Sequence, residues 1–169
     1  MLFAITTAAT IIATLAAAVP ATGPSAGIRY KSIVANIARD KCVDVAGANY
    51  ADGTAIQLAT CSGNNAQKFD MHGYNDHDYV TFHPLDAQHL CLDAGVNPGP
   101  GSLVHLWTCY DVPQQQWAAV TPGLGMLKLK GVDLCLDVKD GVTANGSPLQ
   151  VWSCQPGYPF PNQAFKFNS

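Results

Sequence analysis

Short stretches of alternating apolar and polar residues recur along this chain. In the clearest of them two aliphatic residues flank one polar residue, at 56–58, 104–106 and 149–151. A period of two places alternate side chains on opposite faces of a strand, whereas an amphipathic helix repeats every 3.6 residues. Further short strands are predicted at 69–71, 79–84, 126–131 and 165–167. No stretch has the pattern of a long amphipathic helix, so the fold is predicted to be all-β.

Three sequence motifs each occur three times, in the same order. A cysteine-apolar-aspartate motif stands at 42–44, 91–93 and 135–137. A glycine-led strand ending in a second cysteine stands at 53–61, 101–109 and 146–154. A glutamine-x-aromatic motif follows at 67–69, 115–117 and 163–165. The shared order and spacing indicate an internal repeat, with units at about 29–72, 73–120 and 121–169.

The six cysteines fit the same repeat. Six cysteines allow 15 connectivities in principle. The repeat narrows this choice to one local disulfide in each unit, namely Cys42–Cys61, Cys91–Cys109 and Cys135–Cys154. All cysteines are then used, and none remains for catalysis or for a bond to a second chain.

The N-terminal segment is apolar and uncharged over residues 1–18. Ala16 and Ala18 occupy the small-residue positions of a cleavage site, and Ala21 offers a second one, so we predict a secretory signal peptide. A membrane anchor is the alternative. A disulfide framework agrees with an oxidising compartment. We therefore expect a secreted, extracellular protein with no membrane insertion after cleavage, a short linker at 19–28 and one domain at 29–169.

Composition limits the classes of partner. Charged residues make up 12% of the chain, the net charge is −3 and no basic block occurs. This argues against a nucleic-acid partner, because such surfaces need clustered positive charge. With 48% hydrophobic residues, 15 glycines and 11 prolines, the chain is typical of a turn-rich globular protein with a core.

The combination of these motifs resembles the ricin-type (R-type) lectins over residues 29–168. The resemblance implies a β-trefoil, in which twelve strands form three pseudo-equivalent lobes around a barrel. It also implies that the rings of the glutamine-x-aromatic motifs lie in the shared core: Phe69, Trp117 and Phe165.

Strand parity places the aspartate of each motif on the outer face. In the third unit Cys135 and Asp137 share one face, and Trp152 and Cys154 share the outer face of the next strand. If the cysteines are bonded, we expect Asp137 directly opposite Trp152, flanking a sugar-sized notch. A pyranose can stack its C–H face on an indole and donate its hydroxyls to a carboxylate. The alternative is that Trp152 covers the disulfide and Asp137 caps a turn.

The three units differ at the positions that the family uses for sugar binding. The third unit has the whole set: Asp137, Gln150, Trp152, Asn162 and Gln163. The second has an altered set: Asp93, His105, Trp107, Gln114 and Gln115. In the first, Ala59 replaces the tryptophan and Ala66 the asparagine, so we expect no binding there and a structural role for Asp44.

The resemblance implies a lectin for galactose- or N-acetylgalactosamine-bearing glycans and glycoproteins, with its strongest site in the third unit. We predict no catalysis, no cofactor and no metal. The Gly-x-Ser-x-Gly match at 23–27 lacks its strand-to-helix context, and the histidines and aspartates of 72–78 fit no zinc spacing. A trefoil protease inhibitor acting through surface loops is the main alternative, and a carbohydrate-targeting module of an enzyme is another.

Overall fold

The computed structural model describes residues 28–30, 32–73, 79–119, 125–155 and 160–168. The predicted signal peptide, the 23–27 motif and most of the 72–78 loop lie outside these residues. The described part contains thirteen strands: β1 (Ile28–Tyr30), β2 (Ser32–Ala35), β3 (Lys41–Val45), β4 (Ile56–Thr60), β5 (Phe69–Gly73), β6 (Val80–Pro84), β7 (Leu90–Asp93), β8 (His105–Thr108), β9 (Trp117–Ala119), β10 (Leu127–Leu129), β11 (Leu134–Val138), β12 (Leu149–Ser153) and β13 (Phe165–Asn168).

Helical structure in these described residues consists of short 3₁₀ turns. They are η1 (Ala46–Ala48), η2 (Asn65–Gln67), η3 (Pro113–Gln115), η4 (Lys139–Gly141) and η5 (Pro161–Gln163). None of them has the length and apolar character needed to cross a membrane.

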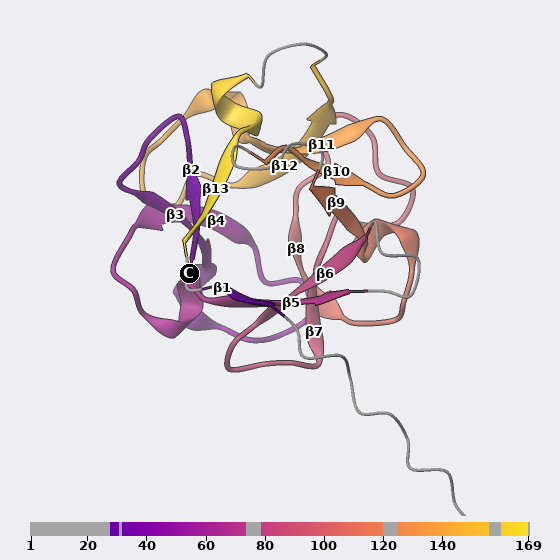
Figure 1. Ribbon diagram of the computed structural model, residues 1–169, viewed down its shortest axis with the longest axis horizontal. Helices are drawn as coiled ribbons and strands as arrows, with labels where there is room; N and C mark the ends of the chain where they lie inside the picture. The colour runs from indigo at the N-terminus through magenta and orange to yellow at the C-terminus, as the bar shows by residue number, and fades with distance from the viewer. Residues whose placement is uncertain (1–27, 31, 74–78, 120–124, 156–159, 169) are drawn as a thin grey trace, which may run out of the picture.

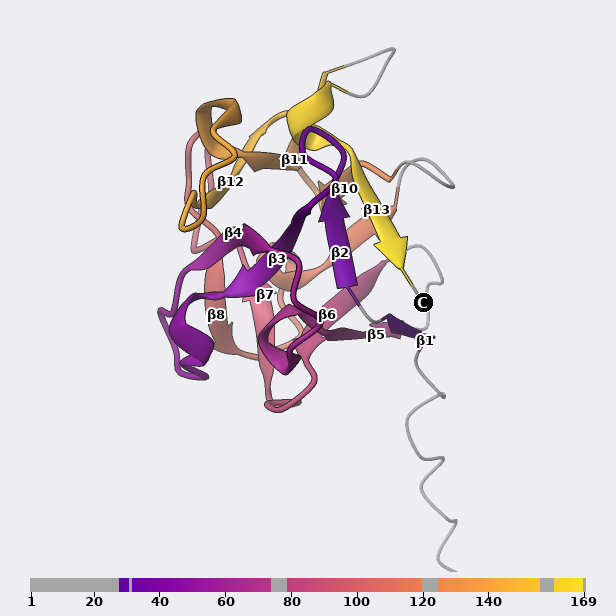
Figure 2. The same ribbon diagram turned by 90° about the vertical axis from the view of Figure 1, so that its left-hand side faces the viewer.

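The strands form three similar lobes around a barrel. Each lobe has one antiparallel hairpin: β3–β4 in the first, β7–β8 in the second and β11–β12 in the third. Three further antiparallel pairs, β13–β2, β5–β6 and β9–β10, form the wall of the barrel (Figure 1). Seen from the side, the hairpins lie at one end, and β2 and β13 lie toward the other (Figure 2). This is the predicted β-trefoil, with β1 as an additional strand paired to β5.

The three hairpins contact one another at the closed end of the barrel. Isolated bridges join each hairpin to the other two: Ala55 with His105, Gln57 with Pro148, and Leu103 with Gln150. The outer face of one lobe is therefore bordered by residues of its neighbours.

The core is built from the aliphatic residues of the alternating stretches. Ile56, Leu58, Leu106, Leu149 and Val151 are fully buried, each beside a polar residue on the opposite face. The aromatic residues of the three glutamine-x-aromatic motifs are also buried in the core, as predicted: Phe69, Trp117 and Phe165. The period-two pattern thus records which face of each hairpin packs inward.

The three disulfides have the predicted local pairing. Cys42 bonds Cys61, Cys91 bonds Cys109, and Cys135 bonds Cys154, over sequence separations of 19, 18 and 19 residues. In the chain-entropy model, closing a loop of this length contributes about 3 kcal/mol to stability.

One detail of the sequence interpretation is wrong, namely the strand register beside each disulfide. Asp137 lies opposite Gln150, and Trp152 lies opposite Cys135. We expected Asp137 to face Trp152 because we placed the bonded cysteines directly opposite each other. Cys154 instead follows the end of β12, and its amide donates to the Asp133 carbonyl at 3.2 Å. The register differs by two residues, so every side chain still lies on the predicted face.

Candidate functional site

Each hairpin presents an aspartate and a polar partner that are paired across the two strands. The pairs are Asp44 with Gln57, Asp93 with His105, and Asp137 with Gln150. These aspartates are almost completely buried, with exposed fractions of 6%, 4% and 3%. They lie on the outer face of their strands, as strand parity predicted, but neighbouring residues cover them.

A small pocket of about 130 Å³ lies on the third lobe. It is lined by Asp137, Asp140, Gln150, Trp152 and Asn162. The Trp152 side chain is 43% exposed, and the Gln150 amide donates to Asp137 Oδ1 at 2.9 Å. A buried carboxylate, two amide side chains and an accessible indole therefore meet in one pocket, although the carboxylate and the indole are diagonal neighbours across the strands.

The electrostatics of the third pocket are dominated by the burial of Asp137. Burial raises the pKa of the Asp137 carboxyl, hydrogen bonds from Gln150 and Gln163 oppose this, and the negative charge of Asp140 raises the pKa further. The hydrogen bonds favour the ionised form because they stabilise the charge. An ionised Asp137 can accept hydrogen bonds from a ligand.

The glutamines of the glutamine-x-aromatic motifs hold the end of each hairpin in place. Gln163 donates to the Ser153 carbonyl at 3.1 Å, and Gln115 donates to the Thr108 carbonyl at 2.8 Å. Both side chains are buried, and neither lines the pocket of its lobe. Of the predicted site residues, these two thus stand behind the pocket walls as positioning residues.

A wider pocket of about 490 Å³ lies on the second lobe. It is lined by Asp93, Gly95, Val96, His105, Trp107, Tyr110, Val112 and Gln114. Trp107 is 40% exposed, and the His105 ring meets it edge-on at 5.6 Å between centroids. His105 Nε2 lies 3.7 Å from Asp93 Oδ1, and the Gly95 amide donates to the same oxygen at 2.6 Å. The arrangement repeats that of the third lobe, with histidine in place of glutamine.

Turn glycines of neighbouring lobes lie behind both tryptophans. A Cβ on Gly53 would lie 3.9 Å from Trp107 Cζ3, and one on Gly101 would lie 3.6 Å from Trp152 Cζ3. Both glycines have positive φ, at +83° and +92°, which favours glycine in these turns. Each indole is therefore supported by the preceding lobe, so the two sites depend on the assembled trefoil.

The first lobe has the aspartate but no aromatic platform. Both Asp44 oxygens are occupied, by the Gln57 amide at 3.0 Å and the Gln67 amide at 3.1 Å. Ala59 stands where the other lobes have tryptophan. The Asp44 carboxylate thus stabilises the lobe internally, which agrees with its predicted structural role.

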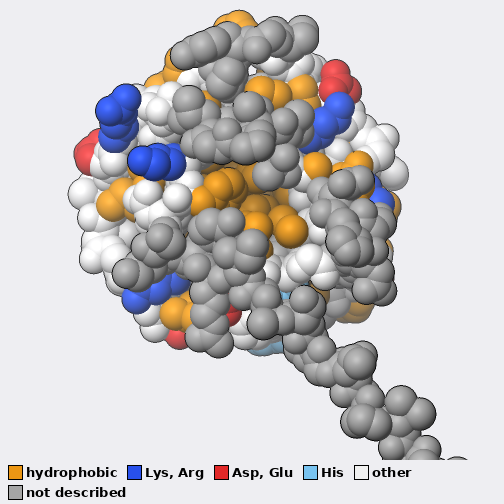
Figure 3. Space-filling view, viewed as in Figure 1, with side chains coloured by type: hydrophobic (Ala, Val, Ile, Leu, Met, Phe, Trp, Pro, Cys, Tyr) orange, Lys and Arg blue, Asp and Glu red, His pale blue; other side chains and the backbone are white. Residues whose placement is uncertain are grey.

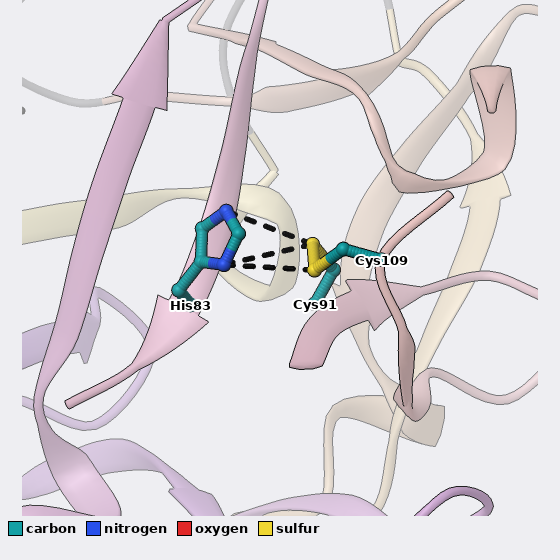
Figure 4. Close-up of side chains that lie close together, drawn as sticks. All are labelled: His83, Cys91 and Cys109. Carbon is teal, nitrogen blue, oxygen red and sulfur yellow. Dashed lines mark hydrogen bonds between the residues drawn. A yellow bond between two sulfur atoms is a disulfide. The ribbon is translucent and has the colours of Figure 1, made fainter. Parts of the chain in front are cut away.

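A second group of polar side chains lies inside the second lobe. His83 on β6 lies beside the Cys91–Cys109 disulfide, with its ring nitrogens 3.5–3.8 Å from the sulfurs (Figure 4). One ring nitrogen and the two sulfurs lie within 4.8 Å of one another, a spacing that could suit a metal ion. The sulfurs are bonded to each other and supply no thiolate, so this group is not suited to bind a metal.

His83 is held as the neutral ring. Its Nδ1 lies 2.8 Å from the Gln88 carbonyl, which only accepts, so Nδ1 carries the proton and Nε2 accepts from the Thr81 hydroxyl at 2.7 Å. Burial, and then the nearby His72, lower the pKa of His83 to about 4.

The sequence motifs did not identify the outer walls of the two pockets. Asp140 in the third lobe and Val96, Tyr110 and Val112 in the second come from turns outside the repeated motifs. The spacing from the site aspartate could have marked Val96 and Asp140, which both stand three residues after it.

On the face seen in Figure 3, charged side chains of both signs are scattered, which fits the absence of a basic block in the sequence.

The chain is similar in sequence to part of a larger bacterial protein. Flavastacin from Elizabethkingia meningoseptica is 30% identical over 151 residues, which are 86% of this chain and 34% of that protein. The chain therefore spans about a third of the length of this relative.

Solved structures share the fold. The designed three-fold symmetric protein ThreeFoil superposes with a TM-score of 0.75 at 22% identity, over 83% of this chain and 98% of that one. The Macrolepiota procera ricin B-like lectin, in complex with lactose, superposes with a TM-score of 0.66 at 17% identity, over 87% and 99% of the two chains. The family profile of the ricin-type β-trefoil lectin domain matches residues 30–166, and the chain belongs to this family.

Proposed function

We propose that this protein is a lectin that binds galactose- or N-acetylgalactosamine-bearing glycans, with its strongest site on the third lobe and a second site on the second lobe. The observation that carries the proposal is the third-lobe pocket, where the exposed Trp152 indole stands beside the buried Asp137 carboxylate. The pocket also contains the amides of Gln150 and Asn162.

The chemistry of this pocket suits a sugar ring. The C–H face of a pyranose can cover the indole, and its hydroxyls can donate to a carboxylate, whose hydrogen bonds contribute about 1.5–3 kcal/mol each. The neighbouring amides supply both donors and acceptors. A shallow site of this kind is expected to be weak, and a millimolar dissociation constant corresponds to about −4 kcal/mol.

Two further observations support the proposal. The Macrolepiota procera lectin of the same fold was solved with lactose, a galactose-containing sugar. The second lobe repeats the aspartate and the exposed tryptophan in a pocket of its own.

We further infer secretion, because the apolar segment 1–18 precedes a domain with three disulfides. In this proposal the glycan is bound and released unchanged.

Calorimetric titration with galactose and lactose tests the proposal. Trp152→Ala removes the platform, and Asp137→Asn removes the charge while its amide oxygen can still accept from Gln150. Each variant should lower the affinity by at least tenfold, because a loss of about 1.4 kcal/mol is tenfold.

Trp107→Ala serves as the matched control and should have a smaller effect. Thermal unfolding of all the variants checks that the fold is intact. Wild-type affinity in folded Trp152→Ala and Asp137→Asn would contradict the third-lobe assignment.

A further inference from the structure

The three lobes provide an internal comparison of one position beside the site aspartate. Three residues after that aspartate stand Gly47, Val96 and Asp140 in the first, second and third lobes. Val96 and Asp140 both line the pocket of their lobe. The pockets share the aspartate and the tryptophan but differ in volume, at about 490 Å³ and 130 Å³. Besides His105 in place of Gln150 and Gln114 in place of Asn162, they differ in the outer wall.

The outer wall of the second-lobe pocket is apolar. Val96 is 82% exposed and Tyr110 is 64% exposed, and Val112 lines the same pocket. Together with Trp107 they bring several solvent-exposed apolar side chains around one cavity. When a ligand covers exposed apolar groups gathered in this way, the free energy of the system falls.

The outer wall of the third-lobe pocket is charged. Asp140 has a φ of +56° in turn η4, and its side chain is 70% exposed. Its carboxylate lies 3.1 Å from the Lys139 ammonium, and its charge acts on Asp137 across the pocket. An apolar group placed against this hydrated carboxylate would displace water from it at a cost in free energy.

We propose that the two pockets select different sugars: the second-lobe pocket prefers a sugar with an N-acetyl group, and the third-lobe pocket prefers the unsubstituted sugar. Val96 and Asp140 are the residues that determine this difference. The inference rests on the proposed glycan-binding function and specifies the ligand of each pocket.

The shape of each wall gives the physical reason. A sugar stacked on Trp107 with its hydroxyls on Asp93 leaves Val96, Tyr110 and Val112 as the surrounding wall. The methyl of an acetamido group can then bury apolar surface, and one buried methyl-sized group corresponds to roughly fourfold in affinity. In the third pocket the same methyl would lie against the Asp140 carboxylate, and the smaller volume leaves less room for it.

Variants with one site each separate the two pockets. Trp152→Ala leaves the second-lobe pocket, and Trp107→Ala leaves the third. Each is titrated with galactose and with N-acetylgalactosamine. The ratio of affinities, N-acetylgalactosamine over galactose, should be roughly four in Trp152→Ala and one or less in Trp107→Ala.

Substitutions at the proposed determinants complete the test. In the Trp152→Ala background, Val96→Asp should reduce the ratio to about one. In the Trp107→Ala background, Asp140→Asn should raise the ratio, because asparagine tolerates the positive φ and carries no charge. Val142→Asp, in a turn of the third lobe where the valine is 50% exposed, is the matched control and should leave the second-lobe ratio unchanged.

The outcomes distinguish this inference from the proposed function. Equal ratios in the two single-site proteins, or a ratio unaffected by Val96→Asp, would overturn the selectivity while glycan binding stands. Binding by Trp107→Ala but not by Trp152→Ala would also overturn it, because the second lobe would then be no site. If the wild type bound neither sugar, both the proposed glycan-binding function and the selectivity would be wrong.

Discussion

The aspartate two residues after each first cysteine has a different role in the first lobe than in the third. In the first lobe both Asp44 oxygens are bonded to glutamine amides within the lobe. In the third, Asp137 accepts from Gln150 and also lines a pocket beside Trp152. The residue is thus a structural acceptor in both lobes, and the adjacent tryptophan adds a ligand-binding role in the third.

Replacement of Asp44 should separate stability from binding. In Asp44→Ala the partly buried Gln57 amide loses its acceptor, and the buried Gln67 amide keeps only the Thr60 carbonyl. A buried polar group left unpaired costs about 1–3 kcal/mol. Urea unfolding should therefore show a lower stability, and titration of the folded protein with galactose should give the wild-type affinity. A large loss of affinity in folded Asp44→Ala would instead place a sugar site on the first lobe.

Individual site residues were predictable to different degrees. The aspartate and tryptophan of the two pockets followed from strand parity and from the family motif. The register did not, because the disulfide joins residues that are not directly opposite: Cys135 pairs with Trp152 in the ladder and bonds Cys154 beyond it. The burial of Asp137 was also missed, since parity identifies a face but not the neighbours that cover it.

At the scale of the elements, strand β6 and the β7–β8 hairpin are coupled through His83. The ring packs against the Cys91–Cys109 disulfide and stacks on His72 at 4.1 Å. It is only 6% exposed. No sequence motif predicted this contact, because the histidine lies outside the repeated motifs and reaches the disulfide only when the strands assemble.

His83 should make the protein less stable in acid. Its pKa is about 4 in the folded protein and about 6.5 in the unfolded chain, so the unfolded state binds the proton first. The stability is complete above pH 6.5 and falls as the pH drops toward 4, by up to about 3 kcal/mol.

Urea unfolding at pH 7 and pH 4.5 measures this loss. His83→Gln should reduce the difference between the two pH values, whereas substitution of the exposed His89 by glutamine should preserve it. An unchanged pH dependence in His83→Gln would show that other groups cause the acid destabilisation.

At the scale of the whole molecule, the trefoil couples the lobes to one another. The hairpins are bridged pairwise, and turn glycines of one lobe support the tryptophan of the next. The repeat in the sequence predicted three similar units. The resemblance to the ricin-type lectins implied that these units form a trefoil. The pocket walls were not predictable in the same way, since they come from turns whose sequences differ between the copies.

In the proposed function, the molecule binds glycans through the two tryptophan-bearing pockets. Two sites on one rigid body can bind a multivalent surface more strongly than either site alone. The most direct measurement is therefore binding of the wild type and of Trp107→Ala/Trp152→Ala to a surface that carries many lactose groups. We predict clear binding by the wild type and none by the double variant, with closely similar thermal unfolding because both side chains are partly exposed. Wild-type binding by the folded double variant would show that glycans bind elsewhere than in these two pockets.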